Sequence, residues 1–390
     1  MVWRILLTAV LVCAPLASGA ALYLPASDDV IVETLPTVAG WSQTERQLRR
    51  ALVQRPRDVP VALAAAQAYL EVARSQGDAR YAGYAMGALQ AWLPMQADTP
   101  NAILVMHATV AQYLHDFDGA EATLKLALKG NPANAQAWLT LATVLRVRGR
   151  YSESDAACHM LARLRQSLYA TACLAENSGL RGDVAAAQTA LRAALASPLL
   201  AGPSQAGIRQ WLLTTLAELA ELAGQADAAD VAYKSALKTE RSGYDAIAYS
   251  DFLLDQKRPA EVLPLLATEP RSDAVLLRLV MATQQLGQGH TPAAQRDVAE
   301  LQARFDAAAQ RPGSSSVHAR EHAMFALAVR QDAPAALALA RQNVLLQREP
   351  IDLLIFARAA VAAGDEPARA EVKALAAQIG LRDARLQALL

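Results

Sequence analysis

Potential metal ligands gather at two places in the sequence. His115, Asp116 and Asp118 stand together in the stretch HDFD, and His318 and His322 are four positions apart. The HDFD stretch is expected at a turn between two helices, where His and Asp side chains also satisfy free backbone groups. The histidine pair would share a helix face, but no third ligand stands near it. We therefore expect no metal site at either place.

Motifs of known enzyme chemistry are absent from the sequence. It contains no phosphate loop, no dinucleotide fingerprint, no nucleophile elbow and no paired-His zinc motif. The 37 basic residues balance the 37 acidic ones and the pI is about 7, so the chain has no long-range field to hold a polyanion. We expect a non-enzymatic protein without a cofactor that does not bind nucleic acid.

The composition favours helices. Hydrophobic residues make up 53% of the chain but aromatic residues only 5%, and the difference is mostly Ala and Leu. Both are strong helix formers, whereas the β-branched and aromatic runs typical of strands are scarce. The sequence therefore predicts an all-α fold.

The first residues are typical of an export signal. Arg4 supplies a positive charge, Ile5 to Val12 form an apolar core, and small residues at cleavage spacing follow up to Ala20. We predict a signal peptide over residues 1–20 and a bacterial periplasmic location. The alternative is an inner-membrane anchor, because Ile5 to Leu24 carry no charge. A lipoprotein is disfavoured, because Cys13 lacks a small residue just before it.

Equivalent residues recur 34 positions apart in the middle of the chain. Leu104 and Trp138 are related in this way, and so are Ala108 and Ala142. Each unit consists of an apolar helix, a short turn, a second apolar helix and a break. One such hairpin cannot bury its own apolar face, so neighbouring hairpins must stack.

These units resemble the tetratricopeptide repeat family. Residues 101–132 carry the matching positions Leu104, Ala108, Phe117, Ala120, Leu124, Ala127 and Pro132. Residues 135–164 carry Trp138, Leu141, Ala142, Gly149 and Tyr151, with departures at Ser154 and Cys158. The resemblance implies a right-handed alpha-solenoid of eight or nine stacked helical hairpins, with the first helix of each hairpin on the concave side.

Boundaries in the chain are few. Residues 21–41 lack helical periodicity and are expected to be extended, and the solenoid is expected over residues 42–390. The stretch QRPGSSS at 310–316 predicts a flexible joint within it. The charged segment GLRDARLQ at 380–387 is expected to form a polar end cap.

Two cysteines are predicted to form a disulfide. The periodicity puts Cys158 on the second helix of one repeat and Cys173 on the first helix of the next, with the turn near Arg165 and Gln166. Both residues then stand at about the same height on antiparallel helices, and export would supply an oxidising compartment. The alternative is two buried free thiols, because a one-residue error in helix phase would turn Cys173 away.

The resemblance also indicates where a partner would bind. Ten residues at positions that project into the groove in the family form a mixed set of aromatic, amide and charged side chains. They are Gln112, Tyr113, Gln136, Thr143, Arg146, Tyr169, Glu176, Trp211, Glu218 and Glu221. They lack the several Lys and Asn residues with which some family members clamp a terminal carboxylate. Trp211 is the strongest candidate, because Trp gives a large contact area at a low cost in entropy.

The sequence thus predicts a scaffold or adaptor of the cell envelope that binds a protein or peptide in its groove. The alternative is an accessory subunit of an envelope export or polysaccharide assembly system that binds a glycan or a client protein. Stacking of sugars on Tyr113, Tyr169 and Trp211 would favour the glycan.

We predict that cell fractionation recovers the protein in the periplasm, with a mature N-terminus near Ala20 or Ala21. The reason is that the apolar core is short and is followed by small residues that a signal peptidase accepts. N-terminal sequencing of the periplasmic fraction checks this. Recovery only in the membrane pellet, with residues 1–24 intact, would favour the anchor.

Overall fold

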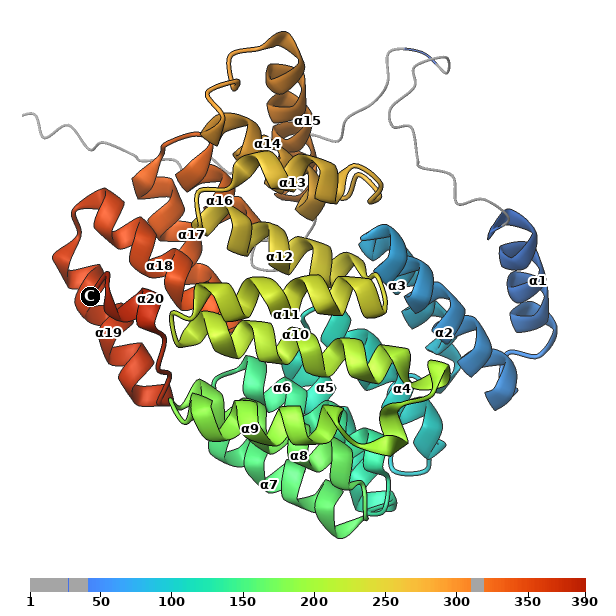
Figure 1. Cartoon of the computed structure of the whole chain (residues 1–390). Coiled ribbons are helices and arrows are strands. Elements are labelled where there is room, and N and C mark those ends of the chain that lie inside the picture. The colour runs from blue at the N-terminus through green and yellow to red at the C-terminus, as the bar shows by residue number, and fades with distance from the viewer. Residues whose placement is uncertain (1–26, 28–40, 310–318) are drawn as a thin grey trace, which may run out of the picture. The chain divides into compact units, whose positions relative to one another are not determined.

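The computed structural model describes Ser27, residues 41–309 and residues 319–390 (Figure 1). Every regular element in these residues is a helix, which confirms the predicted all-α class. Gln43–Leu390 form one compact unit, whereas only Ser27, Trp41 and Ser42 are described from the unit Met1–Ser42. The predicted signal peptide at 1–20 and the predicted joint at 310–316 lie outside the described residues. So does almost all of the segment 21–41, although Trp41 already begins a helix.

The elements follow one another along the chain with short turns between them. They are α1 (Trp41–Gln54), α2 (Val59–Gln76), α3 (Ala79–Ala88), η1 (Gln90–Trp92), α4 (Asn101–Tyr113), α5 (Phe117–Gly130), α6 (Ala135–Val147), α7 (Tyr151–Arg163), α8 (Ser167–Leu180), α9 (Val184–Leu195), η2 (Pro198–Leu200), η3 (Pro203–Gln205), α10 (Ala206–Leu222), α11 (Ala226–Thr239), α12 (Gly243–Asp255), α13 (Pro259–Leu266), α14 (Asp273–Gln285), α15 (Pro292–Ala309), α16 (Ala319–Ala328), α17 (Ala333–Leu346), α18 (Pro350–Ala363), α19 (Glu366–Ile379) and α20 (Ala384–Gln387).

Consecutive helices pair into nine hairpins in the described residues, from α2 and α3 to α18 and α19. In the middle of the chain α4 begins at Asn101 and α6 at Ala135, which reproduces the spacing of 34 residues. The prediction of eight or nine stacked hairpins is confirmed, and the fold is a helical solenoid of the tetratricopeptide type. None of the described helices has both the length and the apolarity that crossing a bilayer requires.

Alanines stand where the two helices of a hairpin cross. Ala108 and Ala120 are fully buried in the first clear repeat, and Ala142 is fully buried in the next. A methyl group at the crossing lets two antiparallel helices approach closely, and larger residues such as Leu124 then fill the space between hairpins. The size of a few side chains thus sets the distances between the packed helices.

The predicted disulfide is confirmed. Cys158 on α7 and Cys173 on α8 are joined, with Cα atoms 5.8 Å apart, inside the range that a disulfide requires. The turn between the two helices is where the periodicity put it, and Arg165 closes it with a φ of 60°. The bridge links two neighbouring hairpins and lies in the core, because Cys158 is fully buried and Cys173 is 1% exposed.

Residues 379–384 lie across the turns of three consecutive hairpins. Gly149, in the turn between α6 and α7, has a φ of 74°, and a Cβ atom there would stand 2.9 Å from Ile379. At the next turn the Arg382 backbone N–H donates to the Leu180 carbonyl at 2.9 Å. At the third turn Ala384 lies against Gly224, 3.6 Å from where a Cβ would be. This segment therefore follows the row of turns from hairpin to hairpin.

The same segment is not the polar end cap that its charges predicted. Leu381 and Leu386 are 4% and 3% exposed, and Asp383 is 1% exposed. Asp383 forms an ion pair with Arg385 at 2.8 Å, and Arg385 also pairs with Glu221 on α10. The prediction was wrong because the apolar residues between the charges are buried against helices that stand far earlier in the chain, among them α10, which α20 contacts.

We predict that Leu386→Ala lowers the free energy of unfolding by about 2–5 kcal/mol, since it empties a site that is almost fully buried. Leu199→Ala is the matched control, because Leu199 is 83% exposed, and it should change stability by less than about 0.5 kcal/mol. Urea unfolding followed by circular dichroism measures both. Equal stability of the two variants would contradict the docking of this segment.

Candidate functional site

The ten residues predicted to line the groove come from the first helices of four consecutive hairpins, α4, α6, α8 and α10. Nine of them are half-buried, and Gln136 is exposed. Three use their polar groups locally or against a neighbouring hairpin. Gln136 donates to Thr140 at 3.3 Å, Thr143 to the Leu139 carbonyl at 3.1 Å, and Tyr113 to the Ala73 carbonyl at 2.9 Å.

Two of the predicted aromatic residues contact each other. The rings of Tyr169 on α8 and Trp211 on α10 stack with centroids 6.2 Å apart and an angle of 27° between their planes. The two rings therefore lie against each other with an offset. Trp211 also packs at the edge of the large hydrophobic cluster that includes Leu212 and Leu216.

Arg146 and Glu176 form an ion pair between α6 and α8 at 2.9 Å. Their side chains are only 16% and 15% exposed. Burial raises the pKa of Glu176, although the charge of Arg146 opposes the shift. The second carboxylate oxygen of Glu176 has no hydrogen-bond partner among the described residues.

Glu218 and Glu221 lie one helical turn apart on α10, and both hold their protons unusually strongly. Burial, and then the charge of Glu176, raise the pKa of Glu218 to about 8. Its carboxylate accepts a hydrogen bond from Tyr244 on α12 at 2.7 Å. Burial also raises the pKa of Glu221 to about 7, even though Arg385 pairs with it and Tyr233 donates to it.

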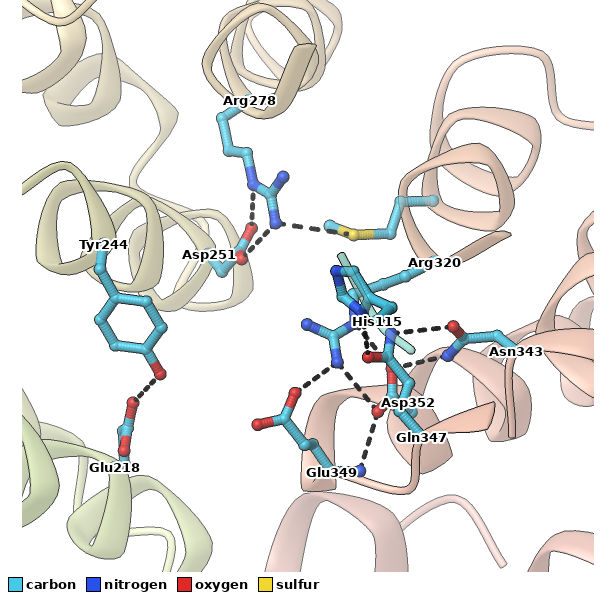
Figure 2. A network of polar contacts seen from close by, with 11 residues as sticks. His115, Glu218, Tyr244, Asp251, Arg278, Arg320, Asn343, Gln347, Glu349 and Asp352 are labelled. Carbon is cyan, nitrogen blue, oxygen red and sulfur yellow. Dashed lines mark hydrogen bonds and ion pairs between the residues drawn. The ribbon is translucent and has the colours of Figure 1, made fainter. Parts of the chain in front are cut away.

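A second network of polar contacts lies opposite Glu218 and Tyr244 (Figure 2). Its residues belong to α16, α17 and α18 and the turns beside them. The guanidinium of Arg320 on α16 binds Asp352 at 2.6 and 3.0 Å and pairs with Glu349. Burial works to raise the pKa of Glu349, but the charges of Arg320 and Arg146 outweigh it and lower the pKa. Asp352 and Glu349 also form the capping box of α18, so the network is anchored at a helix end.

The network continues to the turn between α4 and α5. Asn343 donates to Asp352 at 2.6 Å, and Gln347 donates to Asn343 at 3.0 Å. The Gln347 amide oxygen lies 3.0 Å from Nδ1 of His115. Burial and then the charge of Arg320 lower the pKa of His115, so the imidazole is neutral at physiological pH. His115 is thus a link between distant hairpins, in the turn where the sequence suggested a backbone-capping role.

The four glutamates Glu176, Glu218, Glu221 and Glu349 form what we name the interior acidic face. The charges of the other three all contribute to raising the pKa of Glu218, which places them within electrostatic range of it. The face is reachable by solvent, because Glu349 is 35% exposed at its side chain and Tyr244 is 64% exposed. The structure therefore brings together three of the predicted groove residues and adds Glu349, which sequence reasoning missed.

The suggested metal ligands diverge. Asp116 caps α5 by accepting from the Gly119 N–H at 3.0 Å, and Asp118 pairs with Arg148 at 2.6 Å, while His115 faces Gln347. His318 lies outside the described residues, and the ring of His322 packs 4.4 Å from that of Phe305. Across residues 41–309 and 319–390 no three potential ligands converge.

Comparison with known proteins finds similarity only among solved structures. The sequence matches no family profile, and no curated protein is similar to it. Among solved structures it is similar to that of PilF from Pseudomonas aeruginosa, with 14% identity, 55% of this chain and 96% of that chain covered, and a TM-score of 0.38. A type IV pilus biogenesis factor, PilW, is 20% identical over 64% of this chain and 96% of its own, with a TM-score of 0.36. A tetratricopeptide repeat protein from Parabacteroides merdae is 13% identical over 66% and 98%, with a TM-score of 0.39.

We predict that Glu218→Gln stabilises the protein at pH 8 and leaves it little changed at pH 5. In the unfolded chain the carboxyl ionises above about pH 4.5, whereas the folded protein holds the proton up to about pH 8. Between these values the unfolded state binds fewer protons, so the free energy of unfolding falls as the pH rises, by up to about 1.4 kcal/mol for each pH unit. Glutamine has no proton to lose, so the variant should lack this fall.

Urea unfolding at pH 5 and pH 8 measures the difference. Glu371→Gln is the control, because Glu371 is an exposed partner of Arg341 at the surface. The free energy of unfolding could fall between pH 5 and pH 8 by the same amount in Glu218→Gln as in the wild-type protein. That result would contradict a raised pKa of Glu218.

Proposed function

We propose that this chain is a non-enzymatic scaffold that binds a protein or peptide partner on its interior acidic face. The observation that carries the proposal is the character of that face. Polar and aromatic side chains from α8, α10 and α12 meet the end of α18 there, and Tyr244 remains 64% exposed. An exposed aromatic residue beside half-buried charges is typical of sites that bind protein segments.

The proposed location is the periplasm, with an inner-membrane anchor as the alternative. Two independent features support export: the apolar segment and small residues at 1–20, and the disulfide between Cys158 and Cys173. Structural disulfides persist in oxidising compartments such as the periplasm and are rare in the cytosol.

A protein partner is favoured over a glycan. Sugar binding would use open aromatic faces, but Tyr169 and Trp211 are half-buried and lie against each other. The hydroxyl of Tyr113 is already bonded to the Ala73 carbonyl. Glu218, which has no arginine beside it among the described residues, instead suits a partner that carries positive charge.

We predict that a photo-crosslinking amino acid at Tyr244 captures a specific partner in cells of the producing bacterium. The same residue at Val231 is the control, because Val231 is equally exposed, at 64%, but lies on the second helix of a hairpin, α11. Adducts should form at Tyr244 and be absent at Val231. Mass spectrometry of the adduct identifies the partner.

The crosslink at Tyr244 should weaken when Trp211→Ala is added, because Trp211 lies on α10 with Glu218. Adducts at Val231 alone would show that the opposite helices carry the binding surface and would contradict the proposal.

A further inference from the structure

A small cavity of about 250 Å³ opens between α12, α14, α16 and α18. Its walls are largely apolar and include Leu254, Met281, Met324, Leu327 and Ile355. Methionine side chains adapt to different shapes, so two of them in one wall suit a variable apolar guest. The volume is below the range typical of drug-sized ligands and fits one large apolar side chain.

The cavity adjoins the interior acidic face. Asp251 and Asp255 line the cavity, and their charges add to burial in raising the pKa of Glu221. On the other side Ile351 lines the cavity two residues after Glu349. Apolar surface and carboxylates therefore lie next to each other, within the reach of one short peptide.

Two of the basic residues around the cavity are already paired. Arg358 lines it but pairs with Asp255 at 2.8 Å, and Arg278 binds the carboxylate of Asp251 at 2.9 and 2.7 Å (Figure 2). Lys257 is exposed at the turn after α12. The charges within each of these two pairs neutralise each other, and Lys257 is the remaining cation in the lining.

Glu218 differs from the other glutamates of the face. Glu176, Glu221 and Glu349 each form an ion pair with an arginine. Among the described residues Glu218 forms no such pair and is held by the neutral hydroxyl of Tyr244. A half-buried carboxylate without a cation is costly when it ionises, and a cation from outside would remove this cost.

A buried hydroxyl beside the same face also lacks a partner. Tyr151 is 2% exposed, and its hydroxyl has no hydrogen-bond partner among the described residues. Besides burial, the charges of Glu349, Arg146 and Glu176 act on it, which places the hydroxyl at the acidic face. Buried polar groups are nearly always bonded to protein or to ordered water, so the hydroxyl and the free oxygen of Glu176 are two positions at this face that can bond to a polar group of a ligand.

Resting on the proposed function, we propose that the partner segment carries a basic residue within a few positions of a large apolar residue. The apolar side chain fills the cavity between α12 and α18, and the ammonium or guanidinium group pairs with Glu218. The Glu176 oxygen and the Tyr151 hydroxyl are further hydrogen-bonding groups at the same face. The apolar anchor supplies binding energy, and the cation supplies selectivity against acidic segments.

Binding should release a proton from Glu218 at pH 7. A cation beside the carboxylate favours its ionised form, whereas the empty site holds the proton up to about pH 8. The charged and titratable groups that face Glu218 come from five elements. They are Glu176 on α8, Glu221 on α10, Tyr233 on α11, Tyr244 on α12 and Glu349 before α18.

Three labelled peptides on a common Gly–Ser backbone test the proposal with the full mature chain. The first carries two Lys residues around one Phe, the second replaces Lys by Glu, and the third replaces Phe by Ser. Fluorescence anisotropy should show the first binding at least about tenfold more tightly than the other two. Calorimetry in two buffers with different heats of ionisation should show proton release at pH 7.

Two variants test the two halves of the site. Glu218→Gln should lower the affinity for the first peptide about tenfold and abolish proton release on binding. Ala328→Trp should weaken it similarly, because Ala328 is exposed and lines the cavity, so the larger ring fills the cavity without disturbing the core. Glu371→Gln, a surface change on α19, should bind as the wild-type protein does.

Equal affinity for all three peptides, no binding by any of them, or unchanged affinity in both variants would overturn the inference. These outcomes are separable from failure of the proposed function. If the crosslink at Tyr244 still captures a partner, the scaffold function stands and only the chemistry assigned to its ligand falls.

Discussion

Residues 379–386 rest on the turns of three hairpins, and the interior acidic face depends on this contact. Ile379 occupies the space that Gly149 leaves open, Arg382 bonds to the Leu180 carbonyl, and Arg385 pairs with Glu221. Together with the Arg358–Asp255 pair and the His115–Gln347 contact, it joins the last hairpins to the earlier ones that carry Glu176, Glu218 and Glu221. Burial between these hairpins raises the pKa values of Glu176, Glu218 and Glu221, whereas the charge of Arg320 lowers that of Glu349.

The repeats could be predicted because they depend on contacts between helices that are adjacent in the chain. Ala108 and Ala142 are 34 positions apart, and close helix packing requires small residues at such positions. The disulfide followed from the same arithmetic, because Cys158 and Cys173 lie at similar distances from one turn. Both the repeat packing and the disulfide involve helices that are adjacent in the chain, and such helices can be placed from residue spacing alone.

The interior contacts could not be predicted, because they join residues that no spacing rule relates. His115 meets Gln347 across 232 positions, and Arg385 meets Glu221 across 164. The sequence does contain a sign of the helix end that binds Arg320, since Glu349 and Asp352 have the spacing of a capping box. It does not say which distant arginine such a box will hold. The charges in segment 380–387 misled for the same reason, because burial of Leu381 and Leu386 decides its position.

The contact between residues 379–386 and the hairpin turns also sets the order in which parts of the protein fold during synthesis. Chains emerge from synthesis with earlier domains free to fold first. The turns at Gly149, Gly182 and Gly224 form early, yet the residues that cover them emerge only after all nine hairpins. Until then the carboxylate of Glu221 has no Arg385 beside it and stays in water. Assembly of the glutamate-lined surface is therefore a late step, which a chain interrupted before Ile379 cannot reach.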